Sequence, residues 1–199
     1  WGPQEVGFIS GGSGIAGMSN LSRDYLVYII QNLAELDAIA DTIIVDTGAG
    51  ISDAVLEFLV ASGEIILVTT PEPTSITDSY SLLKALNRHN RFSKEYSKIK
   101  VIANRVDTEE EGRTLYSKLN AVVARYLKLP IEYLGSVPQD SLLSKAVMQQ
   151  KPFSMLYPNS LAGFAVFELA TMLNENMVKE QKQRKGITHL FAKLIRSKR

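Results

Sequence analysis

The sequence predicts an α/β fold in which a mostly parallel, doubly wound sheet carries helices on both faces. Short runs of apolar, β-forming residues recur along the chain without polar alternation, as expected for strands buried on both faces of a parallel sheet. Longer segments lie between them, with apolar residues three and four apart, as on one face of a helix. The 199 residues, 45% of them hydrophobic, suffice for one globular domain with a sizeable core.

The first predicted strand, residues 6–10, runs into the glycine-rich segment 11–14. That segment resembles a phosphate loop only superficially, because no Gly-Lys-Ser/Thr follows, and a glycine turn before a helix is the simpler interpretation. The next helix is expected over 22–36. Its apolar residues, spaced by three and four, are Leu26, Ile29, Ile30 and Leu33.

Residues 43–46 form the next predicted strand, and Ser52 or Asp53 caps a short helix after it. The strand over 64–70 stops at Pro71 and Pro73, which cannot lie in a central strand. Thr74 and Ser75 are then expected to cap a helix that ends near Leu86. The remaining predicted elements are strands over 99–103 and 131–137 and helices over 114–127, 142–149 and 160–174.

Composition excludes some kinds of site and of protein. The chain has no cysteine, so disulfides and thiolate metal sites are excluded. No apolar run approaches the roughly 20 residues of a membrane-spanning helix. The chain begins at Trp1 rather than at a methionine, so we expect a fragment or a processed product.

Asp46 is the first candidate functional residue. It ends an apolar strand and enters the small-residue loop Thr47-Gly48-Ala49-Gly50, where the backbone can approach a charged ligand closely. A carboxylate at that position is suited to hold Mg²⁺ beside the phosphates of a nucleotide. A buried strand that ends in a helix-capping acid and a tight turn explains the same residues.

Four ordered motifs give the sequence a family resemblance. They are Asp46-Thr47-Gly48-Ala49-Gly50, the run from Val68 to Ser75, Ala103-Asn104-Arg105 and Val137-Pro138-Gln139-Asp140. Together they resemble the MinD/ParA family of deviant-Walker P-loop ATPases. Within that family they are most similar to the FlhG branch (also called YlxH or FleN), which regulates flagellar number and placement. The resemblance covers nearly the whole chain.

The resemblance implies a nucleotide site. Asp46 would be the switch II acid that reaches Mg²⁺ through water, and the backbone of Gly50 would sense the γ-phosphate of ATP. Asn104 would hydrogen-bond the adenine edge, with Arg105 near the base; a capping asparagine and a surface ion pair are the structural alternatives. The backbone of three further residues would line the base: Pro138, Gln139 and Asp140.

The resemblance also implies two kinds of protein partner. One is a second copy of the protein, in a homodimer that forms with ATP, and the other is a flagellar assembly protein such as FlhF. Glu72 and Asp78 would face the second subunit or a protein partner, although solvated acids at a helix start are an equal alternative. The family's phosphate loop is absent from the 199 residues. We therefore expect an N-terminally truncated fold, no ATPase activity from this chain alone, and an uncovered sheet edge or face.

A basic tail closes the sequence. Residues 179–199 carry a net charge of +7, against −6 for the rest of the chain. Apolar residues at helical spacing form one stripe: Ile187, Leu190, Phe191, Leu194 and Ile195. Lys193 and Arg196 lie beside it, so residues 187–199 are predicted to bind an anionic membrane surface as an amphipathic helix. Docking on the protein's own body and nucleic-acid binding are the alternatives, but nucleic acid would not need the apolar stripe.

The predicted organisation is a MinD-like domain over 1–175, a linker over 176–186 and the membrane helix over 187–199. The expected function is the carboxyl-terminal part of an ATP-switched regulator of flagellar number and placement, cytoplasmic and peripheral on the inner face of the cell membrane. No nucleic-acid partner is expected. A non-catalytic protein-binding module and a related ATP-dependent enzyme on the same fold are the alternatives.

Overall fold

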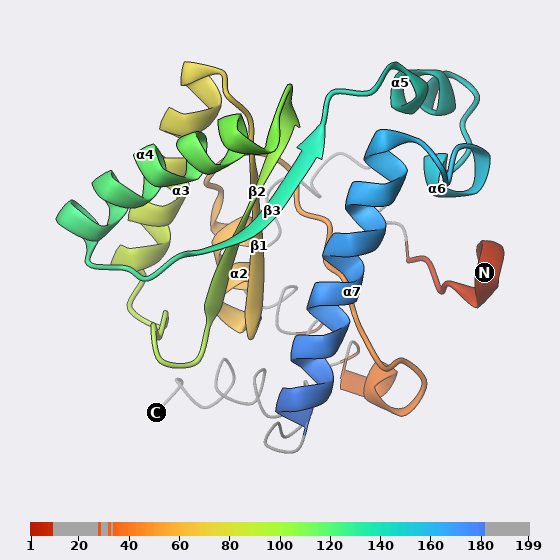
Figure 1. Cartoon of the computed structure of the whole chain (residues 1–199). Helices are drawn as coiled ribbons and strands as arrows, with labels where there is room; N and C mark the ends of the chain where they lie inside the picture. The colour runs from red at the N-terminus through yellow and green to blue at the C-terminus, as the bar shows by residue number, and fades with distance from the viewer. Residues whose placement is uncertain (10–27, 29–31, 33, 182–199) are drawn as a thin grey trace.

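Three parallel strands in the order β1-β2-β3 form the sheet of the computed structural model, which describes residues 1–9, 28, 32 and 34–181 (Figure 1). The strands are β1 (Glu64–Thr69), β2 (Lys98–Val106) and β3 (Glu132–Pro138). Each crossover between them contains a helix, as parallel neighbours require. The predicted α/β class and the parallel sheet are confirmed.

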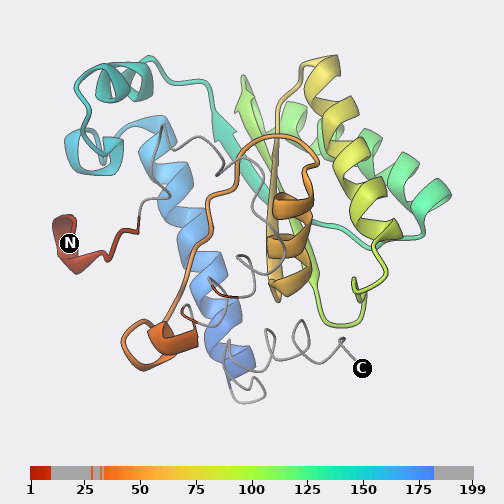
Figure 2. The same cartoon turned by 180° about the vertical axis from the view of Figure 1, so that it is seen from behind.

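Helices lie on both faces of this sheet (Figures 1 and 2). The elements before and between the strands are η1 (Pro3–Glu5), η3 (Ala34–Ala38), α2 (Asp53–Ala61), α3 (Pro73–Arg88) and α4 (Glu109–Leu127). The elements after β3 are α5 (Ser141–Met148), α6 (Phe153–Leu156) and α7 (Leu161–Gln181). None of these described helices combines the length and the apolar character needed to cross a bilayer.

The larger core lies between the sheet and helices α2, α3 and α4. Ile65 and Leu67 of β1 pair with Ile99 and Val101 of β2, so all four side chains point to the same face. They pack against buried leucines and a valine of the helices: Leu56, Leu83, Leu86, Leu119, Val123 and Leu127. This apolar layer holds the strands in register and so positions their carboxyl ends.

The opposite face is covered by α7. Ala162 and Leu169 of this helix pack against Leu134 and Val137 of β3, with Ile102 of β2 beside them. Further along the same face, Ile66 and Val68 of β1 are 43% and 53% exposed. The described residues therefore bury the α7 face of the sheet over β3 and only partly over β1.

The prediction of a strand over residues 43–46 is wrong. These residues are irregular, and Ile44 and Val45 are 86% and 38% exposed. A strand needs a neighbour for its N–H and C=O groups, and none of the three described strands pairs with this segment. Residues 6–9 of the other expected early strand are likewise irregular and exposed, and residue 10 lies outside the described residues.

The prediction that Thr74 and Ser75 cap α3 is also wrong. Thr74 and Ser75 do not begin this helix; Glu72 is its N-cap and Pro73 its first residue. Proline suits that position because its fixed φ matches the helix and its missing N–H would have had no helical partner. The caps by Ser52 on α2 and by Asp140 on α5 are formed by side-chain oxygens.

The remaining differences lie near the chain ends. The helix predicted over 22–36 falls mostly outside the described residues, and its end is the 3-10 helix η3. Helix α7 continues to Gln181, beyond the predicted end at residue 174 and into the segment predicted as a linker. The predicted membrane helix, residues 187–199, lies outside the described residues.

Candidate functional site

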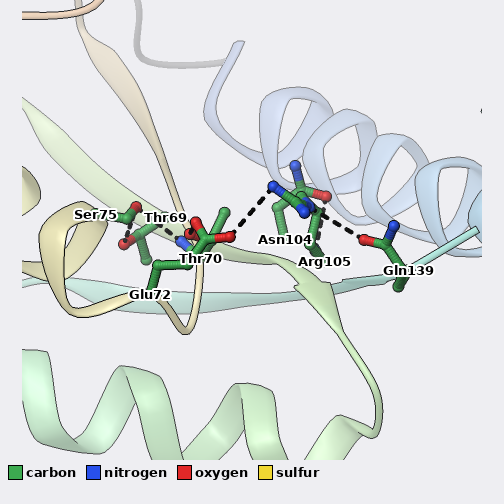
Figure 3. Close-up of polar contacts among 7 residues, drawn as sticks. All are labelled: Thr69, Thr70, Glu72, Ser75, Asn104, Arg105 and Gln139. Atoms are coloured by element: carbon green, nitrogen blue, oxygen red, sulfur yellow. Dashed lines mark hydrogen bonds and ion pairs between the residues drawn. The ribbon is translucent and has the colours of Figure 1, made fainter. Parts of the chain in front are cut away.

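The loop after β1 is fixed by hydroxyl groups at its base. Thr69 is fully buried, and its Oγ1 lies 3.2 Å from Oγ of Ser75. The same Ser75 oxygen accepts the backbone N–H of Thr70 at 3.0 Å, and Thr70 Oγ1 donates to Oε2 of Glu72 at 2.5 Å (Figure 3). These bonds tie the strand end to the first turn of α3. Glu72 is therefore held at the carboxyl edge of the sheet.

The end of β2 bulges at Arg105. Asn104 pairs with Val137 and Val106 pairs with Pro138, so Arg105 has no partner on β3. Its φ of +60° places it in the left-handed region, which costs a residue with a Cβ about 1–2 kcal/mol. In this conformation the backbone N–H of Arg105 donates to Oδ1 of Asn104 at 3.0 Å. The bulge thus orients the amide of Asn104.

The side chain of Arg105 links all three strand ends (Figure 3). Its Nη1 lies 3.3 Å from Oε1 of Glu72, after β1, and its Nε donates to Oε1 of Gln139 at 3.1 Å, after β3. The arginine and the glutamate side chains are 57% and 54% exposed, so their ion pair contributes only about 0.2–1 kcal/mol. We refer to Glu72, Asn104, Arg105 and Gln139 as the edge cluster.

Asp140 closes the site on the β3 side. Its Oδ1 accepts the backbone N–H of Leu142 at 2.8 Å, and its Oδ2 accepts that of Ala162 at 3.2 Å. These two backbone N–H groups, and then a hydrogen bond with Ser160, stabilise the carboxylate and hold the pKa of Asp140 below its usual value. The side chain of Asp140 therefore joins the starts of α5 and α7, while its neighbours Pro138 and Gln139 lie at the strand end.

The sequence-predicted residues are brought together in part. Asn104, Arg105, Pro138, Gln139 and Asp140 all lie where β2 and β3 end, as predicted, and Glu72 joins them through its ion pair. The surface ion pair considered for Arg105 is present. Asp78 is exposed on α3.

Asp46 and Gly50 lie in the exposed loop before α2. Gly50 has a φ of +108°, a conformation that favours glycine. Within the described part of the chain, no group of three or more His, Asp or Glu side chains is placed to hold a metal ion. Asp46 supplies one exposed carboxylate, and it belongs to no such group among the described residues.

From the sequence, no role is assigned to Thr70, and Ser75 is expected only as a helix cap. Both lie in the quoted run from Val68 to Ser75, and the signal that identifies Ser75 is a hydroxyl residue two positions after the proline that starts a helix. From there the Ser75 oxygen reaches back to the strand end. Ser75 therefore fixes Thr70, and Thr70 in turn fixes the side chain of Glu72.

Chemically, the edge cluster offers an oriented hydrogen-bond donor. Because Oδ1 of Asn104 accepts the Arg105 N–H, the Nδ2 group presents its N–H donors to a ligand. A heterocyclic base with an acceptor nitrogen or oxygen fits such a group. In open α/β sheets, ligands bind at the carboxyl ends of the strands, where this cluster lies.

Comparisons with known proteins agree with this fold. The antiactivator FleN of Pseudomonas aeruginosa is 37% identical over 164 residues, which are 82% of this chain and 57% of FleN. The flagellum site-determining protein YlxH of Helicobacter pylori is 33% identical over 78% of this chain and 52% of its own length. The chain thus spans about half the length of these relatives. No family model matches the chain.

Solved structures share the fold at lower identity. The septum site-determining protein MinD of Pyrococcus horikoshii, complexed with Mg-ADP, aligns with a TM-score of 0.55 and 23% identity over 74% of this chain and 55% of that one. A MinC:MinD complex of Aquifex aeolicus aligns with a TM-score of 0.60 and 21% identity over 78% of this chain and 60% of the other. The sequence matches to FleN and YlxH and the shared fold identify the chain as a member of the MinD/ParA family, similar to its FlhG branch.

Proposed function

We propose that this chain forms the carboxyl-terminal part of a nucleotide-switched regulator of flagellar number and placement. The observation that carries the proposal is the edge cluster: a fixed asparagine amide at the carboxyl ends of three parallel strands, in a chain similar to FleN and YlxH. The MinD structure that shares this fold is a complex with Mg-ADP. Adenine nucleotides are therefore the ligands to test first.

In this proposal the Nδ2 group of Asn104 donates to an acceptor of the adenine ring. The backbone of Pro138, Gln139 and Asp140 lines the base, because these residues follow β3 beside the asparagine. Arg105 lies next to the base without pointing a free charge at it, since its guanidinium is bound to Glu72 and Gln139.

Mg²⁺ and the phosphates of ATP belong to the full-length protein in this proposal. Asp46 would hold Mg²⁺ through water, and Gly50 would offer its backbone to the γ-phosphate. A single exposed carboxylate is not a complete magnesium site, so we derive no hydrolytic step from these residues. Chain 1–199 alone is expected to be inactive, because phosphoryl transfer depends on a phosphate loop and its lysine, which the sequence lacks.

Nucleotide-dependent dimerisation would couple the site to the membrane. Two copies of the basic tail in a dimer would bind an anionic bilayer far more tightly than one. Glu72 and Asp78, exposed at the start of α3, would face the second subunit or a flagellar assembly protein such as FlhF. The protein would then be cytoplasmic and peripheral on the inner face of the cell membrane.

Calorimetric titration of the full-length protein with Mg-ADP and Mg-ATP tests the nucleotide site. N104A is expected to weaken binding about tenfold, the effect of one lost hydrogen bond to a ligand. N90A is the matched control, because Asn90 is exposed in the connector before β2, at the other end of the strands. Equal affinities for N104A and wild type would remove Asn104 from the site. Absence of nucleotide binding by the full-length wild type would favour the non-catalytic binding module.

A further inference from the structure

We propose that Arg105 is a positioning residue for base recognition: its backbone orients the Asn104 amide, and its side chain holds that backbone in place. This inference rests on the proposed nucleotide site and assigns Arg105 a role distinct from contact with the base. It follows from three contacts that diverge from a single residue. They are the backbone bond to Asn104 and the side-chain bonds to Glu72 and Gln139.

The backbone of Arg105 is strained and bonds the neighbouring asparagine. Arg105 is the unpaired residue of a β-bulge and has a φ of +60°, where arginine is disfavoured. Strained backbone persists where the surrounding structure over-determines it, and it is concentrated at functional sites. The N–H of Arg105 lies in the peptide plane that joins the bulge to Asn104, and it donates to Oδ1 of Asn104.

The side chain of Arg105 anchors the bulge. The guanidinium is more than half exposed, so its pair with Glu72 contributes little to stability and offsets only part of the cost of the left-handed conformation. The guanidinium matters more for the position of the bulge, because Nη1 and Nε bind residues that follow two different strands. Glu72 is itself fixed by Thr70. The guanidinium thus anchors the bulge to both neighbouring strand ends.

A fixed asparagine amide selects among bases. An asparagine amide that rotates freely can present either its oxygen or its nitrogen to a base. With one lone pair of Oδ1 engaged by the Arg105 N–H, the amide is held in one orientation, and its Nδ2 donors occupy a fixed place. The site should therefore select bases that offer an acceptor at that place, and it should lose this preference when the bulge relaxes.

Arginine variants of the full-length protein separate this role from a direct contact. R105A removes the guanidinium that anchors the bulge, and alanine disfavours a positive φ, so the bulge should relax and nucleotide affinity should fall about fivefold. R105G also removes the guanidinium, but glycine accepts a positive φ, so more of the affinity should remain than in R105A. Equal losses in R105A and R105G would show that the guanidinium itself contacts the ligand and would overturn the proposal.

A double-mutant cycle gives the second test. If Arg105 acts through Asn104, the N104A/R105A protein should bind nucleotide no more than about twofold more weakly than N104A. E72Q should weaken binding in the wild-type background but have no further effect in the R105A background. E110Q is the control, because Glu110 is exposed on the neighbouring helix α4. Additive losses in N104A/R105A would contradict a shared role.

A readout without ligand separates failure of this proposal from failure of the nucleotide site. The side-chain amide of Asn104 should be as rigid as the backbone in wild type, with an NMR order parameter near 0.85, and should fall below about 0.6 in R105A. A rigid Asn104 in a protein that binds no nucleotide would refute the nucleotide site and leave the positioning intact. A mobile Asn104 in the wild type would refute the positioning, whatever the protein binds.

Discussion

The carboxylate of Asp140 accepts a hydrogen bond from the backbone N–H of Ala162, 22 residues further along the chain, at 3.2 Å. The same carboxylate caps α5 through the N–H of Leu142. One side chain therefore fixes the starts of two helices beside the edge cluster. From the sequence, the backbone of Asp140 is expected to line a base at this edge, whereas the side chain of Asp140 stabilises the starts of α5 and α7.

The first prediction concerns acid stability. The pKa of Asp140 is lowered in the folded protein, so this residue stabilises the fold above its ordinary pKa of 3.8 and loses that contribution as the pH falls below it. D140N should lower the urea midpoint of unfolding at pH 7. Because the variant has no carboxylate to protonate, its midpoint should fall less than that of wild type between pH 5 and pH 3. The exposed Asp41 supplies the control D41N. A D140N protein with the same pH profile as wild type would contradict this role.

The second prediction concerns the contact between α4 and β3. A Cβ on Gly112 would lie 1.9 Å from Oγ of Ser136 and 3.2 Å from Cβ of Ala103. Alanine is the better helix former by about 1 kcal/mol, yet G112A should destabilise the protein by about 1–3 kcal/mol because the added methyl group overpacks this contact. S136A removes Oγ of Ser136, the atom nearest to the added methyl group, so the double variant G112A/S136A should recover part of the stability lost in G112A. Chemical denaturation measures both, and a G112A protein as stable as wild type would disprove the close packing.

The sequence predicts the core of the fold well because its signals there are local and repeated. Strands near 64–70, 99–103 and 131–137 are present, and each begins and ends within three residues of its predicted bounds. Leu67 and Val101 are buried, as continuous apolar runs predict, whereas Ile66 and Val68 of β1 are 43% and 53% exposed, so β1 is buried on one face only. The segment 43–46 has the same composition, but a strand also needs a neighbour, and composition does not reveal which neighbours a segment has.

The candidate site is predicted in location but not in detail. The end of a strand can be read from the sequence, so Asn104, Arg105 and Gln139 are found together as expected. The bulge at Arg105 and its left-handed φ arise from the register between β2 and β3, which no local pattern encodes. For the same reason the sequence left open whether Arg105 lies near a base or in an ion pair.

The third prediction compares neighbouring residues of β1. Leu67 is 6% exposed in the larger core, whereas Val68 is 53% exposed on the α7 face. In chain 1–199, L67A should cost about 2–5 kcal/mol of unfolding free energy and V68A about 0.5 kcal/mol. Comparable costs for L67A and V68A in this chain would show that the α7 face is covered over β1. V68A should become more costly in the full-length protein if additional residues cover that face.

The fourth prediction tests the membrane helix predicted over 187–199. Phe191 lies on the apolar stripe, whereas His189 lies on the opposite side of a helix of that sequence. F191E and H189E introduce the same carboxylate, but only F191E removes a buried aromatic group, which contributes about 1.5–3 kcal/mol. Vesicles with anionic lipid should therefore bind F191E at least about tenfold more weakly than H189E, and truncation after Gly186 should abolish co-sedimentation. Equal losses would indicate a purely electrostatic tail, and full binding by the truncated protein would place membrane attachment elsewhere.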